Sequence, residues 1–121
     1  MILITSNRAK QLVYVHYSGQ VEVADFQDRR EDFVAQLSEM KPGFLLLSDL
    51  SQLESMDLAC AAELGKMMTL VADAGIGRVV RIIPDPTKDI GMNILTAFHY
   101  HGRPRPATCA TMAEAAELLG L

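Results

Sequence analysis

The sequence predicts an α/β domain in which a mixed, mostly parallel five-stranded sheet packs against four helices, in the order β-β-α-β-α-β-α-β-α. Three observations support this prediction. The chain begins with two strand-like segments, apolar runs of strand length then alternate with amphipathic helical segments, and turn-forming residues separate one segment from the next. The 121 residues contain no internal repeat or low-complexity tract, so we expect a single domain, 1–121.

A change of period marks the first three elements. Residues 2–4 and 11–17 alternate in the way that is typical of strands, and residues 7–10 between them suit the turn of an antiparallel hairpin. Apolar residues then recur at steps of three and four over 23–40, which predicts an amphipathic helix. The Lys-Pro-Gly step at 41–43 ends that helix.

The middle of the chain contains the strand expected to be most buried. Phe44–Leu47 is apolar without interruption, which is typical of a strand covered on both faces in a parallel sheet. The helical period returns over 57–74 and ends at Gly75, and residues 79–83 form the next strand. Because Gly75 follows a helix and not a strand, it indicates a helix end and not a phosphate-binding loop.

The last third repeats this order. Asp85 followed by a proline suits a helix start, and that helix is expected to run to about residue 101. Two prolines within 103–106 exclude a helix there, and residues 107–110 are a short last strand by their position. Residues 111–114, Thr-Met-Ala-Glu, match a capping box that opens the last helix.

The composition excludes several function classes. Eleven Lys and Arg against fifteen Asp and Glu give a formal net charge of −4, so there is no basic field for a nucleic-acid backbone. No apolar run reaches the roughly 20 residues that span a bilayer. Two cysteines are too few for a disulfide scaffold, which favours the cytoplasm. His99 and His101 point about 200° apart on a helix, so we expect no metal site and no cofactor.

A family resemblance lies after the third strand. Residues 46–58, Leu-Leu-Ser-Asp-Leu-Ser-Gln-Leu-Glu-Ser-Met-Asp-Leu, resemble the signature of STAS domains, the sulfate-transporter and anti-sigma-factor-antagonist modules. In that pattern an apolar strand ends in Asp-Leu-Ser, here 49–51, and a later Asp, here Asp57, opens a helix. Residues 111–118 also resemble the closing helix of these domains. By element order the resemblance covers nearly the whole chain, and it is closest to the small stand-alone branch that lacks the regulatory serine.

One departure from the family pattern bears on regulation. In the regulated antagonists a Ser-Ser-Gly or Ser-Thr-Gly step follows the Asp, and a partner kinase phosphorylates a serine there. Here Leu58, Ala59 and Cys60 follow Asp57, and none of them has a hydroxyl group. We therefore expect no phosphoserine switch at this position.

The resemblance also implies a partner-facing surface between the third strand and the following helix. We expect residues 51–57 to form a loop, with Asp57 as the N-cap of the helix. The alternative is that two apolar residues of this loop, Leu53 and Met56, pack under the helix as a hydrophobic staple. The expected partner-binding residues are Ser51, Leu53, Ser55, Met56, Asp57 and Leu58.

The cysteines and His16 suit structural roles better than chemical ones. A helix N-terminus lowers a thiol pKa, but no histidine in the segment of Cys60 could act as its base, and Asp57 opposes thiolate formation. We therefore expect Cys60 and Cys109 to be buried. His16 lies on an alternating strand and is expected at the surface or at an interface.

The helices over 57–74 and 86–101 carry more apolar residues than a surface helix needs. They are either well buried, or they expose an apolar surface for self-association, with Met67, Met68 and Met92 as candidate interface residues. A third alternative is a cleft between them that carries a small apolar, lipid-like ligand.

From the residues we expect a module that acts by binding and not by catalysis. No nucleophile–base pair and no paired acid–base carboxylates occur in any local frame of the sequence, so we name no catalytic residues. The expected function is that of a regulatory module of the anti-sigma-factor-antagonist type, with a protein partner and a homodimeric state. The alternative function is the apolar-ligand carrier.

Overall fold

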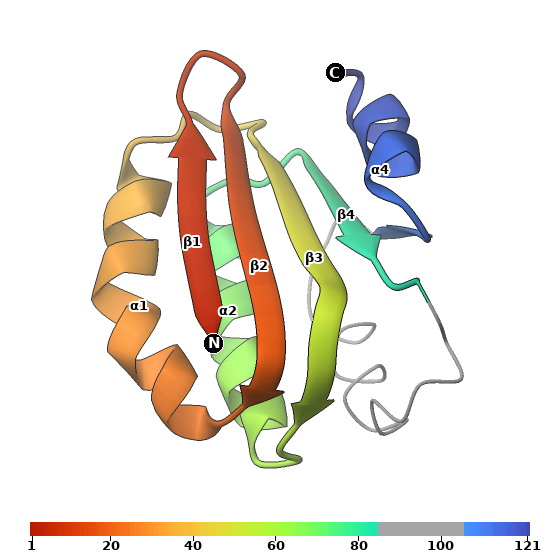
Figure 1. The fold of residues 1–121 in the computed structure, drawn as a ribbon. Coiled ribbons are helices and arrows are strands. Elements are labelled where there is room, and N and C mark those ends of the chain that lie inside the picture. The colour runs from red at the N-terminus through yellow and green to blue at the C-terminus, as the bar shows by residue number, and fades with distance from the viewer. Residues whose placement is uncertain (85–105) are drawn as a thin grey trace.

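The computed structural model describes residues 1–84 and 106–121. The strands are β1 (Ile2–Asn7), β2 (Leu12–Val21), β3 (Leu45–Met56), β4 (Arg78–Ile82) and β5 (Ala107–Cys109). They lie in one sheet in chain order, so each strand pairs with the next one along the sequence (Figure 1). β1 is antiparallel to β2 and the other three pairs are parallel, which confirms the predicted mixed, mostly parallel sheet.

The described helices are α1 (Val23–Ser38), α2 (Cys60–Asp73) and α4 (Met112–Leu119). Three helices are thus seen where the sequence predicts four. The remaining predicted helix, 86–101, lies outside the described residues, together with Met92, His99 and His101. None of the described helices is long and apolar enough to cross a membrane.

Side chains cap the starts of two helices. Asp25 Oδ2 in the first turn of α1 accepts a hydrogen bond from the backbone N–H of Glu22 at 2.8 Å. Thr111 Oγ1 accepts one from the N–H of Glu114 at 3.2 Å, as the capping-box prediction for the last helix requires. These bonds satisfy donors that the first helical turn leaves open, so both helices start where their sequences indicate.

The two faces of the sheet are covered unequally. Val13, Val15 and Tyr17 point to one face, where α1 and α2 pack on them in the larger core cluster. The opposite face, called here the α4 face, carries a smaller cluster in which α4 packs on β4. Figure 1 shows α2 behind the sheet, α1 beside β1 at the left, and α4 next to β4 at the right. The alternation predicted for β2 is thereby confirmed.

β3 extends further than the sequence predicts. Residues 51–56, expected to be a loop, continue the strand. β2 is ten residues long and pairs with β3 as far as Val21 opposite Met56, with two register shifts on the way. This pairing satisfies the backbone of a segment that lacks strong strand formers, and it buries Leu53 and Met56 in the core cluster. The loop prediction is therefore wrong.

A buried ion-pair network joins α1 to α2. Glu63 on α2 is buried although it is charged. Its carboxylate accepts hydrogen bonds from Arg30 on α1 and from Lys66 one turn further along α2, the latter at 3.2 Å. An unpaired carboxylate at this depth would be costly, so both cations stabilise Glu63, and the pair with Arg30 also ties α1 to α2.

Candidate functional site

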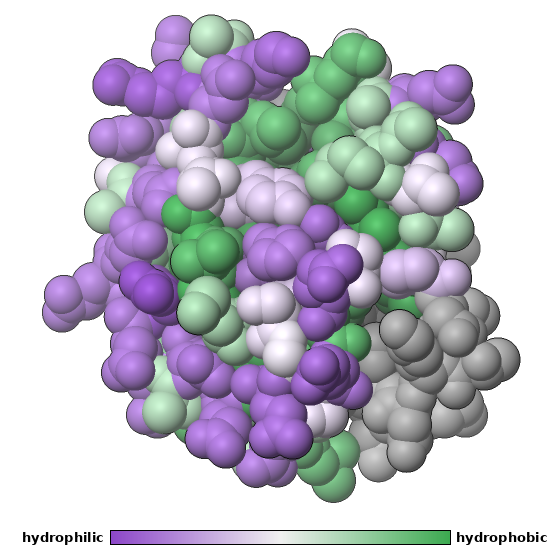
Figure 2. Space-filling view, viewed as in Figure 1, coloured by the Kyte–Doolittle hydropathy of each residue, from purple (hydrophilic) through white to green (hydrophobic). Residues whose placement is uncertain are grey.

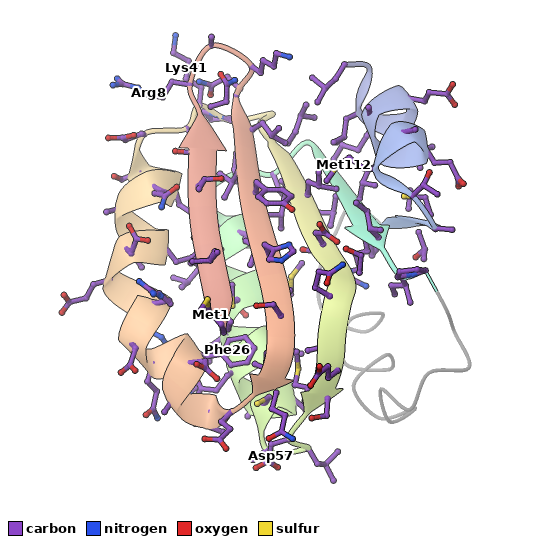
Figure 3. All side chains as sticks on the ribbon, in the orientation of Figure 1. Met1, Arg8, Phe26, Lys41, Asp57 and Met112 are labelled. Atoms are coloured by element: carbon purple, nitrogen blue, oxygen red, sulfur yellow. The ribbon has the colours of Figure 1, made fainter. Side chains whose placement is uncertain are left out.

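The predicted partner-binding residues gather at one end of the sheet, where β3 finishes and α2 begins. This region, residues 51–60, is called here the β3–α2 junction, and Figure 3 shows Asp57 at that end of the molecule. Next to it lies the end of β2. A shallow hollow of about 310 Å³ is lined by Gln20, Val21, Glu22, Ser55, Met56 and Asp57. A second hollow of about 380 Å³ lies along residues 51–54.

The turn into α2 is held by Asp57. Its Oδ1 accepts a hydrogen bond from the backbone N–H of Ala59 at 3.1 Å, and its carbonyl oxygen accepts one from Cys60 at 2.9 Å. Its own N–H donates to the carbonyl of Val21 at 3.1 Å, which ties the turn to β2. α2 itself begins at Cys60 and not at Asp57, because residues 57–59 form a tighter turn before it. Asp57 therefore caps this turn and is not the N-cap residue of the helix.

The structure separates the six predicted contact residues into two groups. Asp57 and Leu58 are exposed, and Ser51 and Ser55 are partly exposed. Leu58 is 58% exposed, the largest value among the large apolar residues described. Leu53 and Met56 are buried, at 3% and 9% exposure. The expectation that Leu53 and Met56 themselves face a partner is corrected: they pack beneath the surface that the other four residues form.

Neither cysteine has a reactive environment. Cys60 is fully buried, and its Sγ faces the carbonyl oxygen of Val21 at 3.7 Å. Burial, with the nearby carboxylates of Asp57 and Asp25, raises the pKa of the Cys60 thiol to about 11. Burial also raises the pKa of Cys109, which lies in the smaller core cluster. Both cysteines are free thiols, and the prediction that they are buried is confirmed.

The two candidate interface residues on α2 differ in burial. Met68 is buried, and Met67 is partly buried against the core cluster. No large apolar side chain of Cys60–Asp73 is exposed. Of the alternatives left open for this helix, burial therefore holds for Met68, because α1 and the sheet cover much of α2, and Met67 stays a partly exposed candidate. Met92 lies outside the described residues.

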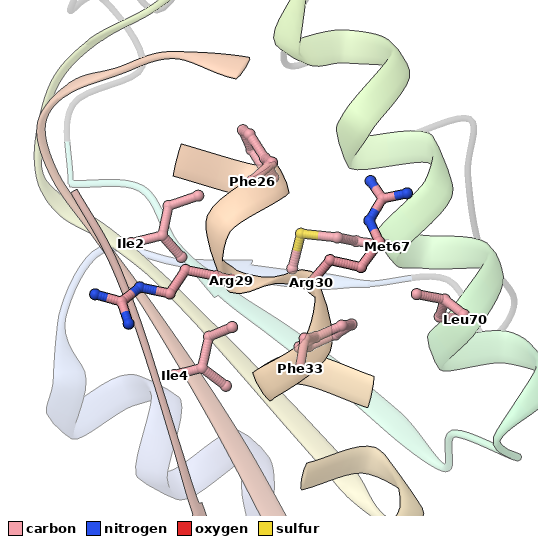
Figure 4. Close-up of a pocket in the computed structure, with 8 residues that line it drawn as sticks. All are labelled: Ile2, Ile4, Phe26, Arg29, Arg30, Phe33, Met67 and Leu70. Carbon is pink, nitrogen blue, oxygen red and sulfur yellow. The ribbon is translucent and has the colours of Figure 1, made fainter. Parts of the chain in front are cut away.

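A cavity between β1, α1 and α2 is too small for a ligand. Its volume is about 10 Å³, about the space that one water molecule requires. Apolar side chains line it together with the stems of two arginines (Figure 4). The lining residues are Ile2, Ile4, Phe26, Arg29, Arg30, Phe33, Met67 and Leu70. The cleft predicted between the helices at 57–74 and 86–101 lies partly outside the described residues.

A hydrogen-bonded cluster on the α4 face does not follow from the sequence reasoning. The Tyr14 hydroxyl donates to Asp49 Oδ2 at 2.7 Å, and His16 Nδ1 lies 3.2 Å from the same oxygen and 3.1 Å from the Tyr14 oxygen. The other oxygen of Asp49 accepts the backbone N–H of Ser51 at 2.9 Å. Because a carboxylate oxygen only accepts, His16 donates from Nδ1 and keeps Nε2 for an outside partner.

The cluster stabilises the charged form of Asp49. Burial alone would raise the pKa of this carboxyl, but hydrogen bonds from Ser51, Tyr14 and His16 outweigh it and hold the pKa below its usual range. The pKa of Tyr14 is raised by burial and by the Asp49 carboxylate. The sequence signal for this cluster is the i, i+2 spacing of Tyr14 and His16, which places them on one face. Asp49 joins them only through the register that pairs it with His16.

The described residues contain no group of three or more His, Cys, Asp or Glu side chains that could hold a metal ion. The cluster on the α4 face contributes one imidazole and one carboxylate, and the junction contributes carboxylates without an imidazole. The arrangement at the junction suits contact with another molecule, because apolar and polar side chains are exposed there side by side. The exposed residues are Gln52, Glu54, Asp57, Leu58 and Ala59, and Ser51 and Ser55 are partly exposed.

No protein-family model matches the chain, and no curated protein sequence matches it. Solved structures do match. The unphosphorylated anti-sigma factor antagonist SpoIIAA is 18% identical with a TM-score of 0.65 and covers 100% of both chains.

Two further structures are similar. A DUF3478-family protein with a SpoIIAA-like fold from Shewanella loihica is 15% identical, with a TM-score of 0.71 over 98% of this chain and 92% of its own. An anti-sigma factor antagonist from Mycobacterium paratuberculosis is 18% identical, with a TM-score of 0.61 over 100% of this chain and 94% of its own. Through nearly its whole length the chain therefore has the STAS-like fold of the anti-sigma factor antagonists.

Proposed function

We propose that the chain is a non-enzymatic, protein-binding regulatory module of the anti-sigma-factor-antagonist type, and that its partner contacts the β3–α2 junction. The observation that carries this proposal is the full-length structural likeness to SpoIIAA and to a second anti-sigma factor antagonist. The contact residues are the four exposed or partly exposed members of the predicted set, Ser51, Ser55, Asp57 and Leu58. Leu53 and Met56 support them from below.

The module binds without a phosphoserine switch. The turn and first helical position after Asp57 are occupied by Leu58, Ala59 and Cys60, so no hydroxyl is present where the family resemblance expects one. Leu58 is the large apolar side chain exposed at the junction, and its removal from water by a partner would contribute hydrophobic free energy to binding. Binding is then controlled by the amount of the two proteins.

Three observations favour binding over catalysis at this site. Its thiol is buried and protonated at neutral pH, as the raised pKa of Cys60 requires. In the described residues neither serine forms a hydrogen bond with a histidine, since His16 and the N–H of Ser51 each bond to the Asp49 carboxylate, and the hollows of the junction are shallow and open. Two free, buried cysteines also fit the reducing cytoplasm, where we place the module.

The proposal is tested by affinity capture with three forms of the protein. The wild type is compared with Leu58→Glu, which puts a charge at the centre of the junction, and with Val34→Glu. Val34 is a matched control because it is 45% exposed on α1, away from the junction. A protein that is captured by the wild type and by Val34→Glu but lost with Leu58→Glu is the expected partner. Capture that never depends on Leu58 contradicts the proposal.

The carrier alternative is examined with the same samples. Native mass spectrometry of the wild type should show the bare polypeptide mass, because the cavity between β1, α1 and α2 has a volume of only about 10 Å³. A retained apolar molecule of constant mass would favour the carrier over the proposed module.

A further inference from the structure

The α4 face of the sheet is only partly covered. Within residues 1–84 and 106–121, α4 packs on β4 and β5, and no other described helix lies on this face (Figure 1). In the described part of the chain, β1, β2 and the near side of β3 therefore have no helix of their own on this face. β2 and β3 form a parallel pair, and parallel strands are normally covered by helices on both faces. A further helix that packed on the α4 face of β1, β2 and β3 would lie on this surface.

The uncovered surface is apolar around a polar centre. It is called here the open strip and consists of Leu3, Leu12, Tyr14, His16 and Leu45. Leu3 is 44% exposed and His16 is partly exposed. Leu12, Tyr14 and Leu45 are also partly exposed, and they pack on one side against the smaller core cluster that α4 covers. Met112 at the start of α4 is also exposed and borders the strip (Figure 3). Figure 2 shows hydrophobic residues gathered on the upper part of this face toward α4, and mixed near-neutral and hydrophilic residues over its middle and lower end.

The size of the open strip corresponds to one α-helix. Adjacent strands lie about 4.8 Å apart, so β1 to β3 spans roughly 10 Å, which is about the diameter of a helix with its side chains. β2 is ten residues long, so at about 3.3 Å per residue the open strip is roughly 33 Å long in the strand direction. A helix of about 20 residues has a similar length. A second β-sheet packed on this face would be wider than the space between the β1 edge and α4.

Charges at the two ends of the open strip favour one direction of such a helix. Arg8 and Lys10 are exposed at the hairpin end, and Glu22 and Glu54 are exposed at the end where β2 and β3 finish. Figure 3 shows Arg8 at one end of the molecule and Asp57 at the other. A helix N-terminus is partly positive and its C-terminus partly negative, so the N-terminus would lie near Glu22 and Glu54. This is the direction in which α1, which starts after β2, already runs.

The middle of the open strip offers one specific hydrogen-bonding atom. His16 is paired with Leu3 on β1 and Asp49 on β3, so it lies at the centre of the floor. Its Nδ1 is engaged with Asp49 and Tyr14, and Nε2 is left to meet an incoming group. The buried carboxylate fixes the imidazole ring, so a polar side chain at the middle of a docked helix would meet a preset partner.

We propose that the open strip binds an amphipathic α-helix of a partner protein. The helix lays an apolar stripe on Leu3, Leu12 and Leu45, carries a polar residue opposite His16, and has basic residues near its N-terminus and acidic residues near its C-terminus. This is the helix-in-groove form of recognition. The five residues of the open strip lie outside the β3–α2 junction, and only the acidic end of the strip, at Glu22 and Glu54, adjoins it. The proposal does not depend on the function proposed for the junction.

The test uses a displayed library of 18-residue helices as the probe. Leucines are fixed at positions 4, 8, 11 and 15, and the other positions are varied. Helices selected on the wild type are then measured by fluorescence anisotropy against Leu3→Glu and Val34→Glu. The two replaced side chains are matched, at 44% and 45% exposure, and lie on β1 and α1. Thermal melts of both variants confirm that they are folded.

We expect the selected helices to lose roughly tenfold or more in affinity for Leu3→Glu and to keep their affinity for Val34→Glu. Their N-terminal halves should be enriched in Lys and Arg, and the amide signals of β1 and β2 should shift on binding. Helices that bind Leu3→Glu as tightly as the wild type overturn the proposal, and so does a selection that yields no binder. Leu58→Glu serves as the independent arm, because it should leave helix binding unchanged whether or not the junction binds a partner.

Discussion

Met56 and Leu58 are two residues apart and should respond in opposite ways to truncation. Met56 is 9% exposed and belongs to the core cluster under the β3–α2 junction, whereas Leu58 is 58% exposed. Removing a buried methionine side chain costs about 2–5 kcal/mol, because apolar contacts are lost and a cavity remains. Met56 borders an open hollow that lets the site relax. We therefore expect Met56→Ala to lower the free energy of unfolding by about 2–3 kcal/mol.

The matching change, Leu58→Ala, should hardly alter the free energy of unfolding. Exposed substitutions usually change the free energy of unfolding by less than about 0.5 kcal/mol, so Leu58→Ala should unfold like the wild type. Urea unfolding at 25 °C and pH 7, followed by far-UV circular dichroism, measures both changes. A loss below about 0.5 kcal/mol for Met56→Ala would refute the placement of Met56 in the core. An equal loss for both variants would refute the separation of the junction into a buried and an exposed group.

Three further predictions concern titratable groups. Arg30→Met should lower the free energy of unfolding by roughly 1–3 kcal/mol in the same urea assay, because it removes a cation from the buried carboxylate of Glu63. Adding Glu63→Gln to this variant should recover part of the loss. An unchanged unfolding midpoint for Arg30→Met would contradict the ion-pair network. The folded pKa of Asp49 lies below its ordinary value of about 4, so the stability it contributes is present above that value and lost as the pH falls through the folded pKa. Urea unfolding from pH 7 to pH 3 should therefore show a smaller acid-induced loss for Asp49→Asn than for the wild type, and parallel curves would count against the cluster. The thiol pKa of Cys60 is raised to about 11, so this thiol should react slowly with a disulfide reagent at pH 8 in the folded protein and quickly in urea. The measurement uses a Cys109→Ser variant, in which Cys60 is the remaining cysteine. Rapid reaction of the folded variant would show that the Cys60 thiol is accessible.

The parts of the fold that the sequence predicts are those with a strong local period. The hairpin, the helix over 23–40 and the buried strand beginning near Phe44 each have apolar residues at a spacing that suits one kind of element. The continuation of β3 through 51–56 has no such signal. Its residues, Ser-Gln-Leu-Glu-Ser-Met, include no β-branched or aromatic side chain. The strand forms there because β2 is long enough to pair with it, which is a tertiary cause.

The candidate site shows the same limit. The signature residues around Asp57 identify the junction, but burial decides which of them face outward, and Leu53 and Met56 face inward because 51–56 is a strand. The Tyr14–His16–Asp49 cluster depends on the register between β2 and β3, which no periodicity within one strand reveals. The apolar excess of α2 likewise gives no information on what covers it, and Met68 is buried.

The claim that this fold acts through the β3–α2 junction is tested most directly by photo-crosslinking from that surface. A photoreactive phenylalanine derivative is placed at position 58 in one form of the protein and at position 34 in the other, since both native side chains are exposed. The proposed function predicts that position 58 gives a covalent adduct with one defined protein in living cells and that position 34 does not. The absence of an adduct from position 58, or the same adduct from both positions, would contradict it.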